Sequence, residues 1–104
     1  MPYRLRTRRF LNVLGYNAGA YILAVVEDSS RHVKGKHGWP YAEIDLTIAD
    51  CDRAVSFDFD LSTRGARRNS LRKIDIMIET LKAFRDALAD EAAVVAARDR
   101  GGAT

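Results

Sequence analysis

The chain of 104 residues contains a single cysteine, Cys51. One cysteine excludes an internal disulfide, which agrees with a reducing compartment. Long apolar runs are lacking as well, since the longest spans only residues 20–26, far too few to cross a bilayer. Residues 1–10 lack the apolar segment that a secretory signal requires. We therefore expect a cytoplasmic protein with no membrane partner.

Residue sets typical of enzymes are also scarce. No histidine is close to Cys51 in the sequence, and His32 and His37 have no third metal ligand beside them. No glycine-rich phosphate loop follows a strand pattern. We expect a protein that is not an enzyme, with no catalytic residues, no bound metal and no cofactor.

Charge, in contrast, is plentiful and sorted into blocks along the sequence. The net charge of +3 is the balance of +5 in residues 1–40, −5 in residues 41–63, +5 in residues 64–73 and −2 in residues 74–104. Blocks of one sign concentrate electrostatic potential on particular surfaces. They therefore bear on what the protein touches more than on how it folds.

The first half of the chain has the pattern of two β-hairpins. Residues 9–16 and 20–27 are rich in Val, Ile, Leu and aromatic side chains, and the Asn-Ala-Gly sequence at 17–19 tolerates the positive φ of a turn. In residues 43–48 and 55–61, apolar and polar side chains alternate, so each of these strands is apolar on one face only.

The turn of the second hairpin falls at residues 50–53, where Asp side chains can hydrogen-bond to their own backbone. With Cys51 and Asp52 as its central residues, Ile48 faces Val55 and Leu46 faces Phe57. The same register sets Asp45 opposite Asp58 and Glu43 opposite Asp60, and like charges directly opposite one another destabilise a sheet unless a cation intervenes. The acidic face consists of Glu43, Asp45, Asp58 and Asp60. Arginines of a neighbouring strand, a symmetry mate or a partner are better candidates for that cation than a metal ion.

A helical pattern begins near Asn69 or Ser70 and continues to about Arg98, where two glycines follow. Its main apolar stripe, at helical spacing, consists of Ile74, Met77, Ile78, Leu81, Phe84, Leu88, Ala92 and Val95. We expect an α+β fold of order ββββα, a four-stranded antiparallel meander with one long C-terminal amphipathic helix across a face. Residues 1–104 form one domain in this prediction, with a basic arm at 1–8, the sheet at 9–61, a basic loop at 62–68, the helix at 69–98 and a tail at 99–104.

Two features predict self-association. The helix is longer than the strands, so its alanine-rich C-terminal part overhangs the sheet, and a second stripe lies away from the first. This second stripe, the expected oligomer interface, consists of Ile76, Ala83, Ala87 and Val94. The first hairpin is apolar on both faces, which one helix cannot cover. A homodimer or larger assembly accounts for both features, and the alternative is that N-terminal residues fold over the second face.

The loop between the hairpins combines cations, aromatic rings and glycines. Its candidate nucleic-acid-binding residues are Arg31, Lys34, Lys36, His37, Trp39 and Tyr41. Mobile cations suit phosphate oxygens and aromatic faces suit exposed bases, so the composition is typical of a nucleic-acid-binding finger. The alternative is a solvated hairpin loop whose Trp39 tucks under the sheet edge.

A second candidate lies before and within the start of the helix. It consists of Arg64, Arg67, Arg68, Arg72 and Lys73. Positive charge at a helix N-terminus opposes the helix dipole, so an anion should compensate it. That anion is either phosphate, bound by backbone N–H groups and arginines together, or the acidic strands of the protein itself.

The helix segments at 71–75 (Leu-Arg-Lys-Ile-Asp) and 81–88 (Leu-Lys-Ala-Phe-Arg-Asp-Ala-Leu) resemble small uncharacterised proteins of phages that infect actinobacteria. The resemblance covers only the helix, and it implies the cytoplasm of the host as the location. The ββββα order is similar to the repeat unit of Whirly and PUR-type single-stranded nucleic-acid binders, which pair through their helices; the similarity is one of architecture and includes no sequence motif.

The function expected from the sequence is therefore a homodimeric, non-enzymatic protein that binds nucleic acid, in its single-stranded form. The alternative is a protein-interaction or virion-assembly component, in which complementary charge blocks hold copies of the chain or a host protein together.

Overall fold

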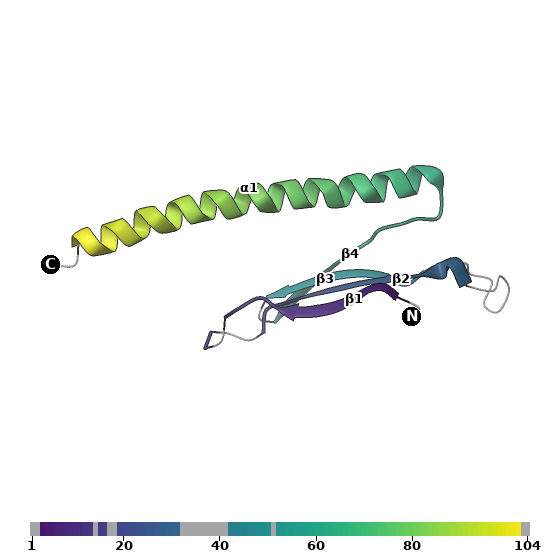
Figure 1. The fold of residues 1–104 in the computed structure, drawn as a ribbon, viewed down its shortest axis with the longest axis horizontal. Helices are drawn as coiled ribbons and strands as arrows, with labels where there is room; N and C mark the ends of the chain where they lie inside the picture. Colours follow the sequence, from purple (N-terminus) through teal and green to yellow (C-terminus); the bar gives the residue numbers. More distant parts are fainter. Residues whose placement is uncertain (1–2, 14, 17–18, 32–41, 51, 103–104) are drawn as a thin grey trace. The chain divides into compact units, whose positions relative to one another are not determined.

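The computed structural model describes residues 3–13, 15–16, 19–31, 42–50 and 52–102. Their elements are β1 (Tyr3–Phe10), β2 (Tyr21–Glu27), the 3-10 helix η1 (Ser29–Arg31), β3 (Ile44–Asp50), β4 (Arg53–Phe57) and α1 (Arg64–Gly102) (Figure 1). Four strands followed by one long helix confirm the predicted α+β fold of order ββββα. The chain forms two compact units, Met1–Ser70 and Leu71–Thr104, and the boundary between them falls inside α1.

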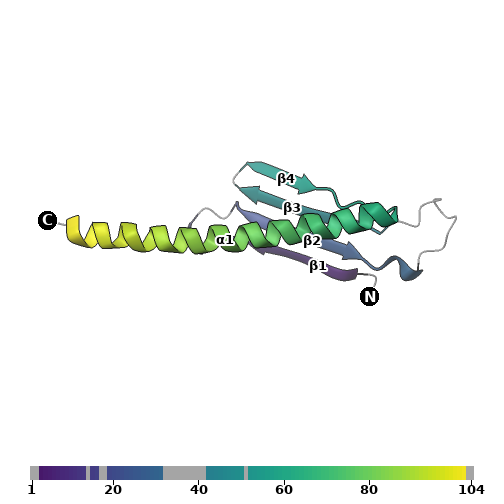
Figure 2. The ribbon, with the colours of Figure 1, turned by 90° about the horizontal axis from the view of Figure 1, so that it is seen from above.

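The four strands form one antiparallel sheet in the order β1-β2-β3-β4, the predicted meander (Figure 2). Side chains alternate along each strand, so the pairing register sorts them onto two faces. The aliphatic face carries Leu5, Ile22, Ala24, Val26, Ile44, Leu46, Ile48, Val55 and Phe57. The mixed face carries Arg6, Arg8, Phe10, Tyr21, Leu23, Val25, Asp45, Thr47, Ala49 and Ser56.

The buried part of the sheet is small. Val25 of β2 and Ala49 of β3, both on the mixed face, are only 5% and 4% exposed, and Thr47 of β3 is buried as well. No large side chain among the described residues is fully buried, whereas Phe10, Leu11, Val13 and Tyr16 are all exposed. Exposed apolar side chains in this number are typical of surfaces that bind a partner.

The first strand lies earlier in the chain than the sequence predicted. The prediction of a strand at 9–16 preceded by a basic arm at 1–8 is wrong, because β1 is Tyr3–Phe10 and pairs Phe10 with Tyr21. Gly15 has a φ of 96°, a left-handed conformation that ends an extended strand and favours glycine. The arginines of the supposed arm therefore belong to an edge strand, where charged side chains hinder pairing with another chain.

The second hairpin has the predicted register, with Ile48 opposite Val55 and Leu46 opposite Phe57. Its last strand is shorter than predicted, however, because β4 ends at Phe57 instead of residue 61. The predicted opposition of Asp45 with Asp58 and of Glu43 with Asp60 is therefore wrong. Like charges directly opposite one another destabilise an antiparallel pair of strands. Here β4 ends before its carboxylates would face those of β3.

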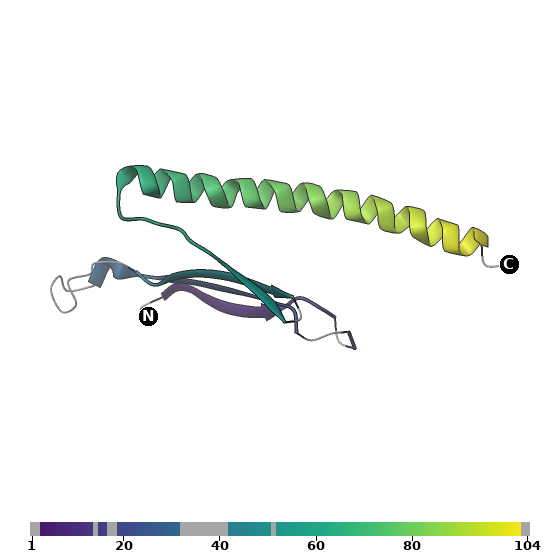
Figure 3. The ribbon, with the colours of Figure 1, turned by 180° about the vertical axis from the view of Figure 1, so that it is seen from behind.

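Helix α1 is unbroken from Arg64 to Gly102 and so begins five residues or more before the predicted start (Figure 3). Thr63 caps it: its Oγ1 accepts a hydrogen bond from the N–H of Ala66 at 3.0 Å, and its carbonyl accepts one from the N–H of Arg67 at 2.9 Å. The prediction of a basic loop at 62–68 is thus wrong for residues 64–68, which are helical, and α1 also continues beyond the predicted end at Arg98.

Candidate nucleic-acid interface

Two arginines of β1 lie against aromatic rings on the mixed face. The Cζ atom of Arg6 is 4.9 Å from the ring centroid of Tyr3, and that of Arg8 is 5.5 Å from the ring of Phe10 and 5.0 Å from the ring of Tyr21. We call these five residues the arginine–aromatic surface. Arg6, Arg8 and Phe10 share a face because they are alternate residues of β1, and Phe10 pairs with Tyr21 on β2. Tyr3 joins the same face because the register of β1 shifts by one residue between Tyr3 and Leu5.

The arginine–aromatic surface is open to solvent at its edge. Both arginines are exposed and Phe10 is 62% exposed, whereas Tyr3 and Tyr21 are half-buried. A guanidinium above an aromatic ring is stabilised by about 0.5–1 kcal/mol at an exposed site. Stacking therefore holds each cation in place while its N–H groups at the rim stay within reach of an anion.

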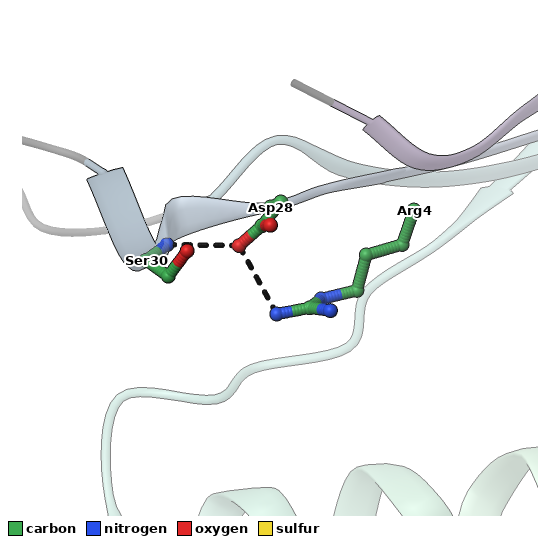
Figure 4. A network of polar contacts seen from close by, with 3 residues as sticks. All are labelled: Arg4, Asp28 and Ser30. Carbon is green, nitrogen blue, oxygen red and sulfur yellow. Dashed lines mark hydrogen bonds and ion pairs between the residues drawn. The ribbon is translucent and has the colours of Figure 1, made fainter. Parts of the chain in front are cut away.

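Arg4 has a different role, because a bulge in β1 sets it apart from the other arginines. Two steps along β1, from Tyr3 to Leu5, lie opposite a single step on β2, from Glu27 to Val26, so Arg4 is the extra residue. Its Nη2 lies 3.0 Å from Oδ1 of Asp28, which also accepts the backbone N–H of Ser30 at 3.0 Å (Figure 4). This ion pair ties the start of η1 to β1 and neutralises Arg4.

The same contacts lower the pKa of Asp28 below its ordinary 3.8, chiefly through the backbone and hydroxyl hydrogen bonds of Ser30 and then through the charge of Arg4. A depressed pKa means that the stabilisation is present above 3.8 and is lost as the pH falls through the lower folded value. We expect Asp28→Asn to have a slightly lower melting temperature than the unmodified protein at pH 7. The difference in melting temperature should disappear at acidic pH.

Thermal melting followed by circular dichroism at several pH values measures this effect. Asp86→Asn is the matched control, because the pair that Asp86 forms with Arg85 is exposed, with relative side-chain accessibilities of 74% and 78%, and exposed pairs stabilise little. A difference between Asp28→Asn and the unmodified protein that persists unchanged below pH 3.8 would contradict the assigned role of Asp28.

The basic residues at the start of α1 divide into two groups. Arg64, Arg68 and Arg72 are exposed and four residues apart, so they form a row along one side of the helix. Arg67 instead donates from Nη1 to the carbonyl of Leu61 at 3.1 Å. The buried hydroxyl of Ser70 donates to the carbonyl of Asp60 at 2.7 Å and so fixes this end of α1 to the residues before it.

Arg67 also lines a cavity of about 600 Å³ together with Asp58 and Asp60. The guanidinium of Arg67 thus binds a backbone carbonyl and shares this cavity with two carboxylates. Lys73, the last of the predicted basic residues, is half-buried on α1.

Carboxylates of the predicted acidic face accept hydrogen bonds from other residues of the protein. Asp45 accepts the hydroxyl of Thr47 at 2.8 Å, and Glu43 lies 3.4 Å from the hydroxyl of Tyr3. Asp60 accepts the backbone N–H of Ser62 at 2.9 Å, and hydrogen bonds from Ser62 lower its pKa. Of the four, Asp58 and Asp60 follow β4 and share the cavity, whereas Asp45 is in β3.

The remaining predicted residues lie in two places. Lys34, Lys36, His37, Trp39 and Tyr41 are outside the described residues, and Arg31 ends η1. The residues of the second stripe all lie on α1 and are exposed: Ile76, Ala83, Ala87 and Val94.

Sequence reasoning missed the arginine–aromatic surface. Its signal was present, because Arg4, Arg6 and Arg8 alternate between Tyr3 and Phe10 with the period of a strand. Because residues 1–8 were assigned to a basic arm, the contact of Arg8 with Tyr21 was not predicted. That contact depends on the pairing of β1 with β2.

No protein-family model, curated protein or solved structure matches this chain. Its function therefore has to be argued from its own residues. Among the described residues, no helix has the length and apolar content needed to cross a membrane. Within the same ranges, no three His, Cys, Asp or Glu side chains are grouped as metal ligands would be.

Proposed function

We propose that the protein is a non-enzymatic binder of single-stranded nucleic acid. The observation that carries the proposal is the arginine–aromatic surface, where Arg6 and Arg8 of the edge strand β1 stack against Tyr3 and Phe10 of the same strand and Tyr21 of β2. Binders of single strands without sequence preference combine cations that follow the backbone with rings on which bases stack. Each stacked base contributes about 1–3 kcal/mol in such proteins.

Single strands suit this surface better than a duplex. Bases in a duplex are stacked on one another, and their faces are out of reach of side chains, whereas unpaired bases can stack on an exposed ring such as Phe10. The guanidinium groups of Arg6 and Arg8 can then bind the phosphates that follow each base. The row of Arg64, Arg68 and Arg72 on α1 provides further phosphate ligands.

Titration of a fluorescent single-stranded oligonucleotide with the full-length protein tests the proposal. Affinity should fall steeply between about 50 mM and about 200 mM salt, because phosphate contacts release counterions. The duplex of the same sequence should bind more weakly. Absence of binding at the lower salt concentration would refute the function proposed for this chain.

The basic segment at 31–41 is part of the same proposal, and its lysines predict a loss of affinity that does not depend on the sequence of the nucleic acid. Replacing Lys34 and Lys36 by Ala should lower the affinity several-fold, and by a similar factor for every oligonucleotide tested, because phosphate contacts carry no base information. Equal titrations with poly-pyrimidine and mixed-sequence oligonucleotides measure this. A loss of affinity confined to one oligonucleotide sequence would mean that this segment contacts bases.

A protein-interaction or virion-assembly component is the second candidate. The exposed apolar side chains favour it, among them Phe10, Val13 and Tyr16 on the sheet unit and Leu81, Phe84 and Leu88 on α1. Surfaces of this kind need a partner whether or not nucleic acid binds. The homodimer expected from the sequence is compatible with both candidates and stays a prediction.

A further inference from the structure

Strand β4 forms one edge of the sheet and has few of the features that keep an edge from pairing with another chain. The order β1-β2-β3-β4 leaves one side of β1 and one side of β4 without a neighbouring strand among the described residues. Proteins protect such edges with charged side chains, proline or a bulge. Strand β1 has a bulge at Arg4 and arginines along its length, whereas β4, with the sequence Arg-Ala-Val-Ser-Phe, is regular and has one charged residue, at its start.

The pairing of β4 with β3 determines which of its backbone groups face outward. In an antiparallel ladder, alternate residues of a strand bond to the neighbouring strand, and the residues between them direct N–H and C=O to the other side. Asp50 and Arg53 pair across a turn of two residues and so form a hydrogen-bonded pair. Alternation then makes the backbone groups of Ala54 and Ser56 face away from β3. The Oγ of Ser56 and the Oγ1 of Thr47, 2.8 Å apart, agree with this register, because side chains lie closer in pairs that do not exchange backbone hydrogen bonds.

The outward groups of Ala54 and Ser56 need hydrogen-bond partners of their own. None of the backbone hydrogen bonds that the described residues make outside the regular elements reaches either residue. A helix cannot supply such partners, because its backbone groups are bonded within the helix. Water or a further strand can supply them, and a further strand extends the ladder.

We propose that β4 pairs with β4 of a second copy of this chain, in antiparallel orientation about a two-fold axis at Val55. Ala54 of each copy then lies opposite Ser56 of the other, and the outward N–H and C=O groups of these two residues bond to each other. The two Val55 side chains are neighbours on the joined aliphatic face, and Arg53 lies opposite Phe57 of the second copy. The two four-stranded sheets become one continuous sheet.

Strand geometry selects this register. Outward groups meet outward groups only when the axis passes through a residue. With the axis at Ala54, Ser56 would pair with Asp52 of the turn, and with the axis at Ser56, Ala54 would pair with Asp58, after the strand has ended. The axis at Val55 keeps the ladder within β4 and places no like charges opposite one another inside it. Asp52 and Asp58 of the two copies then face each other beyond the ends of the ladder, where salt screens their repulsion.

Charge and closure favour a second β4 as the partner over β1. About an axis at Thr7, two copies of β1 would set Arg6 opposite Arg8, and about an axis at Arg6 they would set that residue opposite itself. Pairing of β4 with β1 of another copy would continue from chain to chain, whereas a two-fold pair of β4 strands closes and leaves only the protected β1 edges. The arginine–aromatic surfaces then lie near the two ends of the joined sheet, away from the axis.

Proline at position 54 tests the pairing. Ala54→Pro removes an N–H that faces outward and none that bonds to β3, so the sheet should be retained, which circular dichroism checks. The dimer dissociation constant should rise about 100-fold, because the two-fold axis makes the loss occur twice. Ala54→Ser is the matched control, which keeps the N–H and should leave the constant unchanged. Sedimentation equilibrium without nucleic acid, up to about 0.5 mM protein, measures the constants, since interfaces of this small size associate weakly.

Disulfide formation tests the register and does not depend on the folding of the proline variant. In a Cys51→Ser background, Val55→Cys should be oxidised by copper phenanthroline to a linked dimer at least about tenfold faster than Ala54→Cys or Ser56→Cys. The two Cα atoms at position 55 are about 4.5 Å apart in the proposed pair, within the range of a disulfide. Those at positions 54 and 56 are more than about 7 Å from their counterparts, beyond that range.

The opposite results would overturn the proposal. A protein that stays monomeric throughout this concentration range has no β4 pair. A dimer that Ala54→Pro leaves intact and Ile76→Asp abolishes is formed by the second stripe of α1 instead. Association that continues beyond the dimer indicates pairing of β4 with β1, and faster linkage of Ala54→Cys or Ser56→Cys contradicts the axis at Val55. None of these measurements involves nucleic acid, so their failure leaves the proposed binding function untouched.

Discussion

Replacing both Arg6 and Arg8 by Glu should lower the affinity for a single-stranded oligonucleotide about 100-fold at low salt. Both side chains stack on aromatic rings of the mixed face, so the change removes two phosphate ligands and sets two carboxylates against the phosphate backbone. The slope of log affinity against log salt concentration should also become shallower by about 1.4, because each phosphate contact with a single strand contributes about 0.7 to that slope.

The matched control is the pair Arg98→Glu and Arg100→Glu in the last turns of α1, which changes the net charge by the same amount. If binding depended on total charge alone, both double variants would lose affinity equally, and the arginine–aromatic surface would have no special role. A milder double variant, Arg6→Gln with Arg8→Gln, removes the phosphate contacts without adding repulsion. Its affinity for the oligonucleotide should be about tenfold lower than that of the unmodified protein. Circular dichroism establishes that the sheet is retained in each variant.

The contribution of the aromatic rings to binding can be measured separately from that of the arginines. Phe10→Leu keeps an apolar side chain at the exposed end of β1 but removes the ring on which a base would stack. It should weaken binding without changing the salt dependence, because no ion is released by stacking. A change in the salt slope with Phe10→Leu would mean that the ring acts only by positioning Arg8, whose guanidinium lies above it.

The sheet was predictable where one face of a strand is apolar. Ile48 opposite Val55 and Leu46 opposite Phe57 followed from a period of two and from the turn between the strands, because a slip by one residue would turn the apolar side chains to the other face. Strand β1 had no apolar face in its sequence, since Arg4, Arg6 and Arg8 alternate there with Leu5, Thr7 and Arg9. Its pairing with β2 is set by tertiary context that local sequence does not contain.

Helix α1 was predictable in its interior but not at its start. No local preference marks that start, because Gly65 has low helix propensity and the three nearby arginines oppose the dipole at an N-terminus. Thr63 as the capping residue and the hydrogen bond from Ser70 to the carbonyl of Asp60 outweigh both effects. The candidate site was not predicted either, because the contact of Arg8 with Tyr21 depends on how β1 pairs with β2 and not on local sequence.

The acidic residues after β4 distinguish the two candidate functions. Asp58 and Asp60 line one cavity with Arg67, so they lower the positive potential at the start of α1. A protein carrying Asp58→Asn and Asp60→Asn should bind single-stranded oligonucleotide about fivefold more tightly at low salt, with its self-association unchanged. Asparagine at position 60 keeps an oxygen that can accept the N–H of Ser62, so the turn before the helix should be retained.

An assembly component would respond in the opposite way. If the two carboxylates meet basic residues of another copy or of a partner protein, their replacement should weaken association, and no gain in oligonucleotide affinity should follow. Sedimentation and oligonucleotide titration on the one purified variant, beside Asp86→Asn as a control for the loss of charge elsewhere, measure both quantities. If neither quantity changes, Asp58 and Asp60 are a solvated face, and the blocks of charge in this sequence no longer support either function.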